Sequence, residues 1–300
     1  KQTKRRISYT IRMVEQRNMD RKRWPKRIGE AGMQLIWPWR CPVCFDIVSN
    51  AGNLHNGLCC NACYPKIRFV GGATCYKCGA MLIRKEDEFC PECRTKNRNF
   101  VQGIALMDYT CEAAAHLLWK LKYENGREFA AFLTEEMIAR YGAQIQNWQA
   151  EVILPVPVHK SKKRERGYNQ AEVLAKKLGR KLGIPVDTKV LVRVKKTVAQ
   201  KKLGLQERLD NLQGAFSATD RAAAYRRVIL LDDIFTTGST AYVCVSQLLT
   251  KGVQEVYLVN YSIGRGVGSR EDPYAGGKND RGKDNPEGGR RLKGEWDRGR

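Results

Sequence analysis

The cysteines are the residues of this sequence whose spacing points most directly to chemistry. Nine of the 11 cysteines lie between Cys41 and Cys93, and eight of these nine form four C-x-x-C pairs. A C-x-x-C turn lets two thiolates approach one metal ion, and two such turns complete the four-thiolate shell that Zn²⁺ favours. We therefore expect two structural zinc ions, bound by Cys41, Cys44, Cys60, Cys63, Cys75, Cys78, Cys90 and Cys93.

The spacing alone leaves open how the four turns share the two ions. We favour a sequential arrangement, in which the first two turns bind one ion and the last two the other, because the intervening loops are short. An iron–sulfur cluster or a redox-active dithiol is the alternative chemistry. Gly79, just after Cys78, permits the positive φ that such turns often need. Cys59, Cys111 and Cys244 are left outside the predicted ligand set.

A second group of reactive side chains follows the apolar run RVILLDDI. This run is typical of a buried strand, and it contains Asp232 and Asp233 close to its end. A short loop of hydroxyl residues and glycine comes next and opens a helix: Thr236, Thr237, Gly238, Ser239 and Thr240. At such a turn the free backbone N–H groups and the helix dipole favour an anion. The motif predicts a phosphate cradle beside two carboxylates that can accept hydrogen bonds from a sugar diol or help hold a metal bound to pyrophosphate.

Basic residues follow the other strand-like run, VILPVPV, and could neutralise a second phosphate. His159 stands directly after this run and is the one histidine near the predicted cradle. Lys160 and Arg166 belong to the basic stretch KSKKRERGYNQ that comes next. A solvated start of a basic helix is the alternative interpretation of the same stretch.

The net charge of +23, from 54 basic and 31 acidic residues in a chain of 300, makes polyanions the expected partners. This excess is local, since residues 1–40 carry 12 − 3 = +9 and residues 160–208 carry 16 − 4 = +12. We interpret residues 1–40 as a basic N-terminal arm, either solvated or bound to nucleic acid. Residues 265–300 are rich in glycine and mixed charge, so we expect a disordered C-terminal tail.

The acidic pair, the hydroxyl-rich loop and the basic stretch lie among alternating strand and helix patterns, which must position them. Strand, helix and strand in succession indicate a parallel sheet flanked by helices, so we expect an α/β domain over residues 101–264. A zinc-binding cysteine module over residues 41–100 precedes it and has so little core of its own that its metal should fold it. The strand-like segments are 152–158, 227–234 and 255–261, and the helical apolar faces lie in 114–121, 129–137, 171–182 and 240–249.

VILLDDIFTTGST resembles the phosphoribosyltransferase motif, in which a hydrophobic strand, two acids, two apolar residues and T-T/S-G-x-T follow one another. The resemblance implies a type I phosphoribosyltransferase-like fold that binds 5-phosphoribosyl 1-diphosphate (PRPP) together with Mg²⁺. Asp232 and Asp233 would contact the ribose hydroxyls and serve as the catalytic pair. The loop from Thr236 to Thr240 would hold the 5′-phosphate. The pyrophosphate loop would lie near residues 156–160, which makes His159, Lys160 and Arg166 further candidates for substrate binding.

Other segments narrow the resemblance. The four C-x-x-C pairs, LKYENGRE, LPVPVHKSKKRERGYNQAEVLA and VAQKKLGLQERLDNLQGAF together resemble the ComF family, which are competence-associated phosphoribosyltransferase-like proteins with an N-terminal double zinc ribbon. The resemblance covers roughly residues 41–264. It implies binding of PRPP and single-stranded DNA during DNA uptake in natural competence, and the +12 charge of residues 160–208 makes DNA contact physically reasonable.

Two alternatives stay open. The chain could be an active phosphoribosyltransferase, in which residues near Gln200 to Arg208 close as a lid, or its site could bind without catalysing. It could also be a PRPP sensor whose arm and zinc module dock a helicase or another competence protein. No run of about 20 apolar residues is present, so we expect no membrane span and a cytoplasmic setting.

Overall fold

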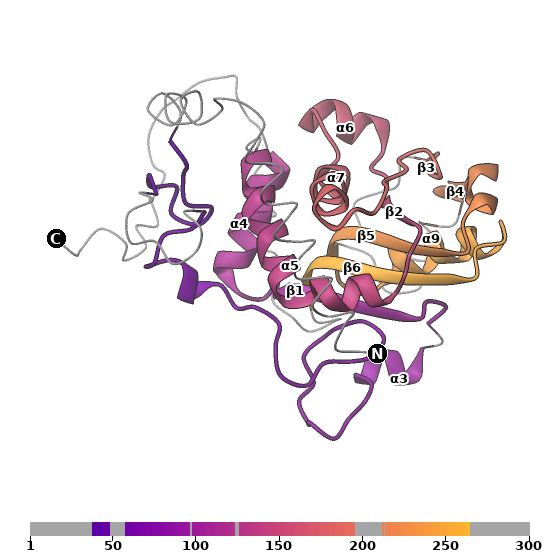
Figure 1. The fold of residues 1–300 in the computed structure, drawn as a ribbon, viewed down its shortest axis with the longest axis horizontal. Coiled ribbons are helices and arrows are strands. Elements are labelled where there is room, and N and C mark those ends of the chain that lie inside the picture. The colour runs from indigo at the N-terminus through magenta and orange to yellow at the C-terminus, as the bar shows by residue number, and fades with distance from the viewer. Residues whose placement is uncertain are drawn as a thin grey trace, which may run out of the picture. The chain divides into compact units, whose positions relative to one another are not determined.

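The computed structural model describes residues 38–48, 58–96, 98–123, 126–195, 212 and 214–264 (Figure 1). The predicted arm lies outside the described residues except for residues 38–40. The predicted tail and the predicted lid, Gln200 to Arg208, lie wholly outside them. The structural statements that follow concern the described residues.

Four parallel strands form the central sheet, in the order β1-β6-β5-β2. Because all neighbouring strands pair in parallel, their carboxyl ends meet at one edge, where ligands of open α/β sheets bind. Leu231 of β5 pairs with Val259 of β6, which fixes the register at the centre. The strands are β1 (Gln102–Asp108), β2 (Val152–Pro155), β5 (Arg227–Phe235) and β6 (Glu255–Ile263).

Helices cover both faces of this sheet, because each strand sends alternate apolar side chains to opposite sides. Ile229 and Leu231 of β5 pack into one buried cluster, and Val228 and Leu230 pack into the other. The first cluster holds α4 (Glu112–Tyr123), α5 (Ala130–Asn147) and α7 (Gln170–Leu182). The second holds α9 (Ser239–Leu249), η4 (Asp220–Ala224) and a small antiparallel sheet of β3 (Leu191–Arg193) and β4 (Phe216–Ala218).

The cysteine module packs on β1 through backbone contacts. Val70 donates its N–H to the carbonyl of Leu106 at 2.9 Å, and Phe69 forms an isolated bridge with Met107. Gly103 of β1 permits this approach, since a Cβ there would lie 2.7 Å from the Lys77 carbonyl oxygen. The remaining short helices are η1 (Tyr64–Lys66), α3 (Pro91–Thr95), η2 (Arg127–Phe129) and α6 (Lys160–Arg166).

The predicted parallel sheet flanked by helices is confirmed, and so is the four-cysteine type of the N-terminal module. The predicted apolar face of α4 is buried at Ala114, Leu117, Leu118 and Leu121. Two features were not predicted: β1, and the small β3–β4 sheet. In the described part of the chain, no helix has the length and apolar character needed to cross a bilayer.

Candidate functional site

The site is built where β5 ends and α9 begins. Gly238 stands between them with a φ of 75°, the left-handed conformation that glycine adopts at little cost. No other residue would fit, because a Cβ at Gly238 would lie 2.6 Å from the ring of Phe235. Gly238 also caps α9 and offers no side chain to its first turn, so the turn's backbone N–H groups stay available to an anion.

Two hydroxyl groups are ordered inside this loop. The Thr237 and Ser239 hydroxyl oxygens lie 2.9 Å apart, and both residues are buried. A hydroxyl group can donate one hydrogen bond and accept another, so one of the two hydroxyls can donate to a phosphate oxygen while it still accepts from the other. The loop from Thr236 to Thr240 therefore has the backbone and side-chain donors that a phosphate monoester requires.

Asp232 and Asp233 are consecutive residues of β5 near its carboxyl end, and their two side chains interact with each other. Asp233 lies on the α4 side, where its Oδ2 is 3.0 Å from the Lys122 ammonium. Burial alone would raise the pKa of Asp233, but the charge of Lys122 and its hydrogen bond act in the opposite direction, and overall the pKa of Asp233 is lowered. Burial, followed by the Asp233 charge, raises the pKa of Asp232 well above its usual value.

The two carboxyl groups thus differ in how readily they ionise, because their surroundings shift their pKa values in opposite directions. A pair of this kind combines a fixed carboxylate with a group that gains or loses a proton when a ligand arrives. The arrangement is suited to holding hydroxyl groups of a sugar while positive charge develops or a cation approaches. Both acids are present and placed as the motif implies; their contact with ribose remains a prediction.

Arg166 completes the cationic side of the site. Its guanidinium lies over the Tyr123 ring at 4.9 Å, donates to the Tyr123 hydroxyl at 3.3 Å and helps to lower the pKa of Asp233. Lys122 and Tyr123 were not singled out from the sequence, although both lie in the LKYENGRE segment that carries the family resemblance. The ion pair with Asp233 makes Lys122 part of the site.

His159 and Lys160 stand at the other predicted phosphate loop, after β2. The His159 Nδ1 accepts the Ser161 N–H at 3.2 Å and thereby caps α6, a structural role that the sequence did not reveal. Lys160 is exposed in the first turn of α6. No contact between either residue and the aspartate pair occurs in the described structure, so their part in substrate binding stays a prediction.

The eight predicted ligands form two groups of four thiols, and within each group the sulfur atoms lie within 4.8 Å of one another. The groups are Cys41, Cys44, Cys60, Cys63 and Cys75, Cys78, Cys90, Cys93. This confirms the sequential sharing of the C-x-x-C turns. Four converging thiols and no other donor fit tetrahedral Zn²⁺. The Cys59 sulfur lies 3.8 Å from that of Cys41, outside the first group, and Gly79 has the expected positive φ of 76°.

Comparisons with known proteins agree with this architecture. The Double zinc ribbon domain family matches residues 32–94. The chain is 33% identical over 235 residues to competence protein F of Haemophilus influenzae, an alignment that covers 75% of this chain and 96% of that protein. The chain belongs to the ComF family.

Other similarities of this ComF chain are more distant. DNA utilization protein YhgH of Salmonella typhimurium is 27% identical over 227 residues, which covers 74% of this chain and 93% of that protein. Among solved structures, glutamine phosphoribosylpyrophosphate amidotransferase from B. subtilis, complexed with ADP and GMP, is 23% identical with a TM-score of 0.26. That match covers 37% of this chain and 22% of the other.

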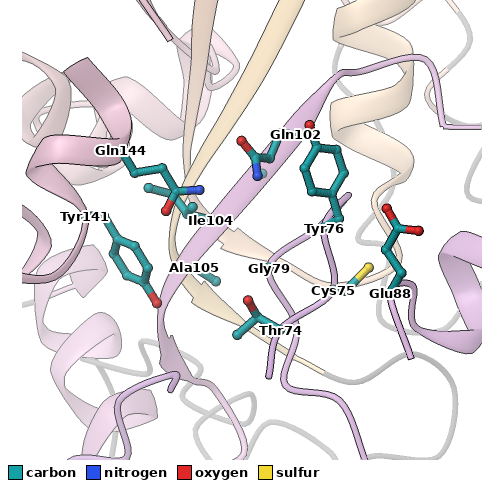
Figure 2. Close-up of a pocket in the computed structure, with 11 residues that line it drawn as sticks. Thr74, Cys75, Tyr76, Gly79, Glu88, Gln102, Ile104, Ala105, Tyr141 and Gln144 are labelled. Carbon is teal, nitrogen blue, oxygen red and sulfur yellow. The ribbon is translucent and has the colours of Figure 1, made fainter. Parts of the chain in front are cut away.

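A cavity of about 240 Å³ lies between the second zinc ribbon and the sheet of this ComF chain (Figure 2). Figure 2 shows Tyr141 and Gln144 of α5 on one side and Tyr76 and Glu88 of the ribbon on the other. The described lining includes the carboxylate of Glu88 and no basic side chain. Because a phosphate ligand needs positive charge or free N–H donors, this cavity is not the phosphate site.

Proposed function

We propose that this ComF-family protein binds PRPP at the β5–α9 loop and single-stranded DNA on a basic surface beside it, in DNA uptake during natural competence. The observation that carries the proposal is the N-terminus of α9, which receives no side-chain hydrogen bond from its N-cap Gly238, close to Asp233 with its lowered pKa and Asp232 with its raised pKa. The loop suits the 5′-phosphate, and the acids suit the ribose hydroxyls. The names of the relatives, a competence protein and a DNA utilization protein, supply the process.

Magnesium fits the same account as a companion of the ligand. The described site offers carboxylate oxygens at Asp232 and Asp233, and Mg²⁺ prefers one or two carboxylates together with phosphate oxygens. When bound, the ion would neutralise the diphosphate of PRPP. Lys122 and Arg166 would balance the negative charge of Asp233, while Asp232 would accept a hydrogen bond from a ribose hydroxyl.

The DNA part of the proposal depends on helices α6 and α7. Their sequences KSKKRER and QAEVLAKKLGRKL carry 5 − 1 = +4 and 4 − 1 = +3 charges. Part of this charge is already paired, since Lys163 and Lys176 both contact Glu172. Arg164 is exposed and takes part in none of the ion pairs of the described residues. A positively charged surface of this kind suits the backbone of a single strand.

The test is a binding titration of PRPP with and without Mg²⁺, repeated in the presence of single-stranded DNA. We expect PRPP binding that Mg²⁺ strengthens, and DNA binding that weakens steeply with salt. Arg164→Glu should weaken DNA binding, whereas Lys85→Glu, an equal charge change on the exposed zinc ribbon, should not. No PRPP binding by the intact protein would overturn the proposal, and a flat salt response would remove its DNA part.

An active phosphoribosyltransferase is the second candidate, because both carboxylates of the acid pair are present beside the loop. This activity requires release of pyrophosphate from PRPP with some nucleobase or aromatic acid as acceptor. The release should disappear in the double variant Asp232→Asn plus Asp233→Asn. Absence of release by the intact protein across such a panel of acceptors, with PRPP still bound, would favour the binding role.

A further inference from the structure

Arg98 lies in the segment that joins the second zinc ribbon to β1, and its side chain is buried against the predicted phosphate loop. Only 8% of the residue is exposed. Its Nη2 donates to the carbonyl oxygen of Thr237 at 3.1 Å, and its guanidinium carbon lies 5.9 Å from the centre of the Phe235 ring. A Cβ added at Gly238 would lie 2.7 Å from its Nη1. Arg98 therefore supports the loop from behind.

The hydrogen bond to Thr237 determines which way the next N–H group points. In a trans peptide the C=O of one residue and the N–H of the next lie on opposite sides of the peptide plane. The described chain has no cis peptide bond. Because the Thr237 carbonyl points at Arg98, the N–H of Gly238 must point to the other side of the loop. The N–H of Gly238 is therefore free to join the first-turn N–H groups of α9, which receive no side-chain cap, in binding an anion.

The charge of Arg98 is not balanced within the described structure. None of the ion pairs there includes Arg98, and its Nε is buried without a hydrogen-bond partner. A buried guanidinium with one neutral acceptor is costly unless an anion comes close. A phosphate on the far side of the peptide between Thr237 and Gly238 would be that anion, separated from Arg98 by only a few atoms of low-dielectric protein.

The zinc ribbon holds this arginine in place. Cys93, a member of the second cysteine group, lies in the middle of α3 and precedes Arg98 by five residues. The adjacent Asn99 donates to the Tyr242 carbonyl at 3.3 Å and to the Ser246 hydroxyl at 2.7 Å, both in α9. Phe100 is 1% exposed and packs edge-on to Phe235. The segment thus contacts the strand, the loop and the helix that form the site.

We infer that Arg98 is a positioning residue for the phosphate monoester of a phosphoribosyl ligand, held against the β5–α9 loop by the second zinc ribbon. The inference rests on the proposed PRPP site and deepens it. It gives the zinc module a defined role, because the module then supplies a buried cation that aims the Gly238 N–H and favours negative charge at the N-terminus of α9. The aspartate pair and the diphosphate end of the ligand have no part in this role.

Isothermal titration of the zinc-loaded protein with ribose 5-phosphate, inorganic pyrophosphate and PRPP tests the inference. Arg98→Gln should weaken ribose 5-phosphate and PRPP by about tenfold or more, the usual size of a lost charge-assisted contact, and leave pyrophosphate unchanged. Arg98→Lys, which keeps the charge, should recover part of the loss. Arg94→Gln, an exposed arginine of α3 that pairs with Asp87, is the matched control and should bind like the wild type.

A second measurement needs no variant. In ¹H–¹⁵N spectra of the wild-type protein, ribose 5-phosphate should shift the Gly238 amide strongly downfield. An unmoved Gly238 amide in a protein that binds the ligand would overturn the inference, as would equal affinity of Arg98→Gln and wild type for ribose 5-phosphate. Failure of the proposed function is distinguishable, because the wild type would then bind none of the three ligands, and the role of Arg98 would fall with it.

Discussion

The two acids of the site should respond oppositely to removal of their charge. Asp233→Asn leaves the Lys122 ammonium, whose side chain is 20% exposed, without its carboxylate partner at 3.0 Å. Loss of one member of a largely buried pair should lower the free energy of unfolding by about 2 kcal/mol. Asp232→Asn instead removes a half-buried carboxyl group whose pKa is raised. It should raise the free energy of unfolding at neutral pH by about 1 kcal/mol.

The pH dependence has a defined sign for each variant. Folding raises the pKa of Asp232, so the wild-type protein loses stability as the pH rises through that pKa and the carboxyl group ionises. The gain in free energy of unfolding from Asp232→Asn should therefore not become smaller toward alkaline pH. The pKa of Asp233 is lowered, so its stabilising contribution is complete above the unfolded value near about 4. The decrease in the free energy of unfolding caused by Asp233→Asn should therefore be the same at every pH near neutrality.

Thermal unfolding of the zinc-loaded variants between about pH 6 and 8.5, where thiolates keep their metal, measures both effects. A loss of about 2 kcal/mol corresponds to a lower melting temperature by about 4 to 8 °C for a domain of this size. Both variants should lose PRPP affinity in parallel titrations. A lower melting temperature for Asp232→Asn than for wild type at neutral pH would refute the reasoning on the charge states of the pair.

Three further predictions concern the loop, the metals and the proton. In chemical denaturation, Gly238→Ala should lower the free energy of unfolding by about 2 kcal/mol or more, and it should abolish PRPP binding. Gly183→Ala is the control, because Gly183 has a similar φ of 72° but no atom near the added Cβ, and it should lower the free energy of unfolding by only about 1 kcal/mol. Elemental analysis should find two zinc ions per chain; Cys75→Ser should lower that number and Cys59→Ser should not. Binding of Mg²⁺ and PRPP should lower the pKa of Asp232, so calorimetry in buffers of different ionisation enthalpy should detect proton release that grows as the pH falls toward that pKa; zero release at every pH would contradict its raised pKa.

The sequence predicted those parts of the molecule that short-range patterns encode. The strand RVILLDDI, the loop at Gly238 and the helix after it are local in sequence, and the structure forms them as expected. The two zinc groups were equally readable, because the C-x-x-C spacing brings thiols together within each turn.

The parts that were missed depend on contacts between distant segments. Strand β1 has Gly103, a poor strand former, at its second position, and this glycine is needed because the Lys77 carbonyl comes so close. Lys122 looks like an ordinary helix lysine until Asp233 is folded against it. Arg98 is one of 54 basic residues, and only the folded chain shows that this one is buried against the predicted phosphate loop.

The basic residues of this chain include two kinds of cation, some exposed on the surface and some enclosed at the candidate site. Helices α6 and α7 expose several of the cations of residues 160–208, whereas Lys122 and Arg98 are enclosed beside the acid pair and the loop. Exposed cations suit a long polyanion such as a nucleic-acid strand, and enclosed ones suit one small anionic ligand. The two kinds of cation thus correspond to the two ligands of the proposed function.

The most direct test of the central claim is ³¹P NMR of PRPP titrated with the zinc-loaded protein and Mg²⁺. The spectrum resolves the 5′-phosphate from the two phosphorus atoms of the diphosphate. If the β5–α9 loop is the phosphate cradle, the 5′-phosphate signal should shift or broaden with wild-type protein and stay unchanged with Gly238→Ala. A spectrum in which only the diphosphate signals respond, or in which none does, would contradict the account.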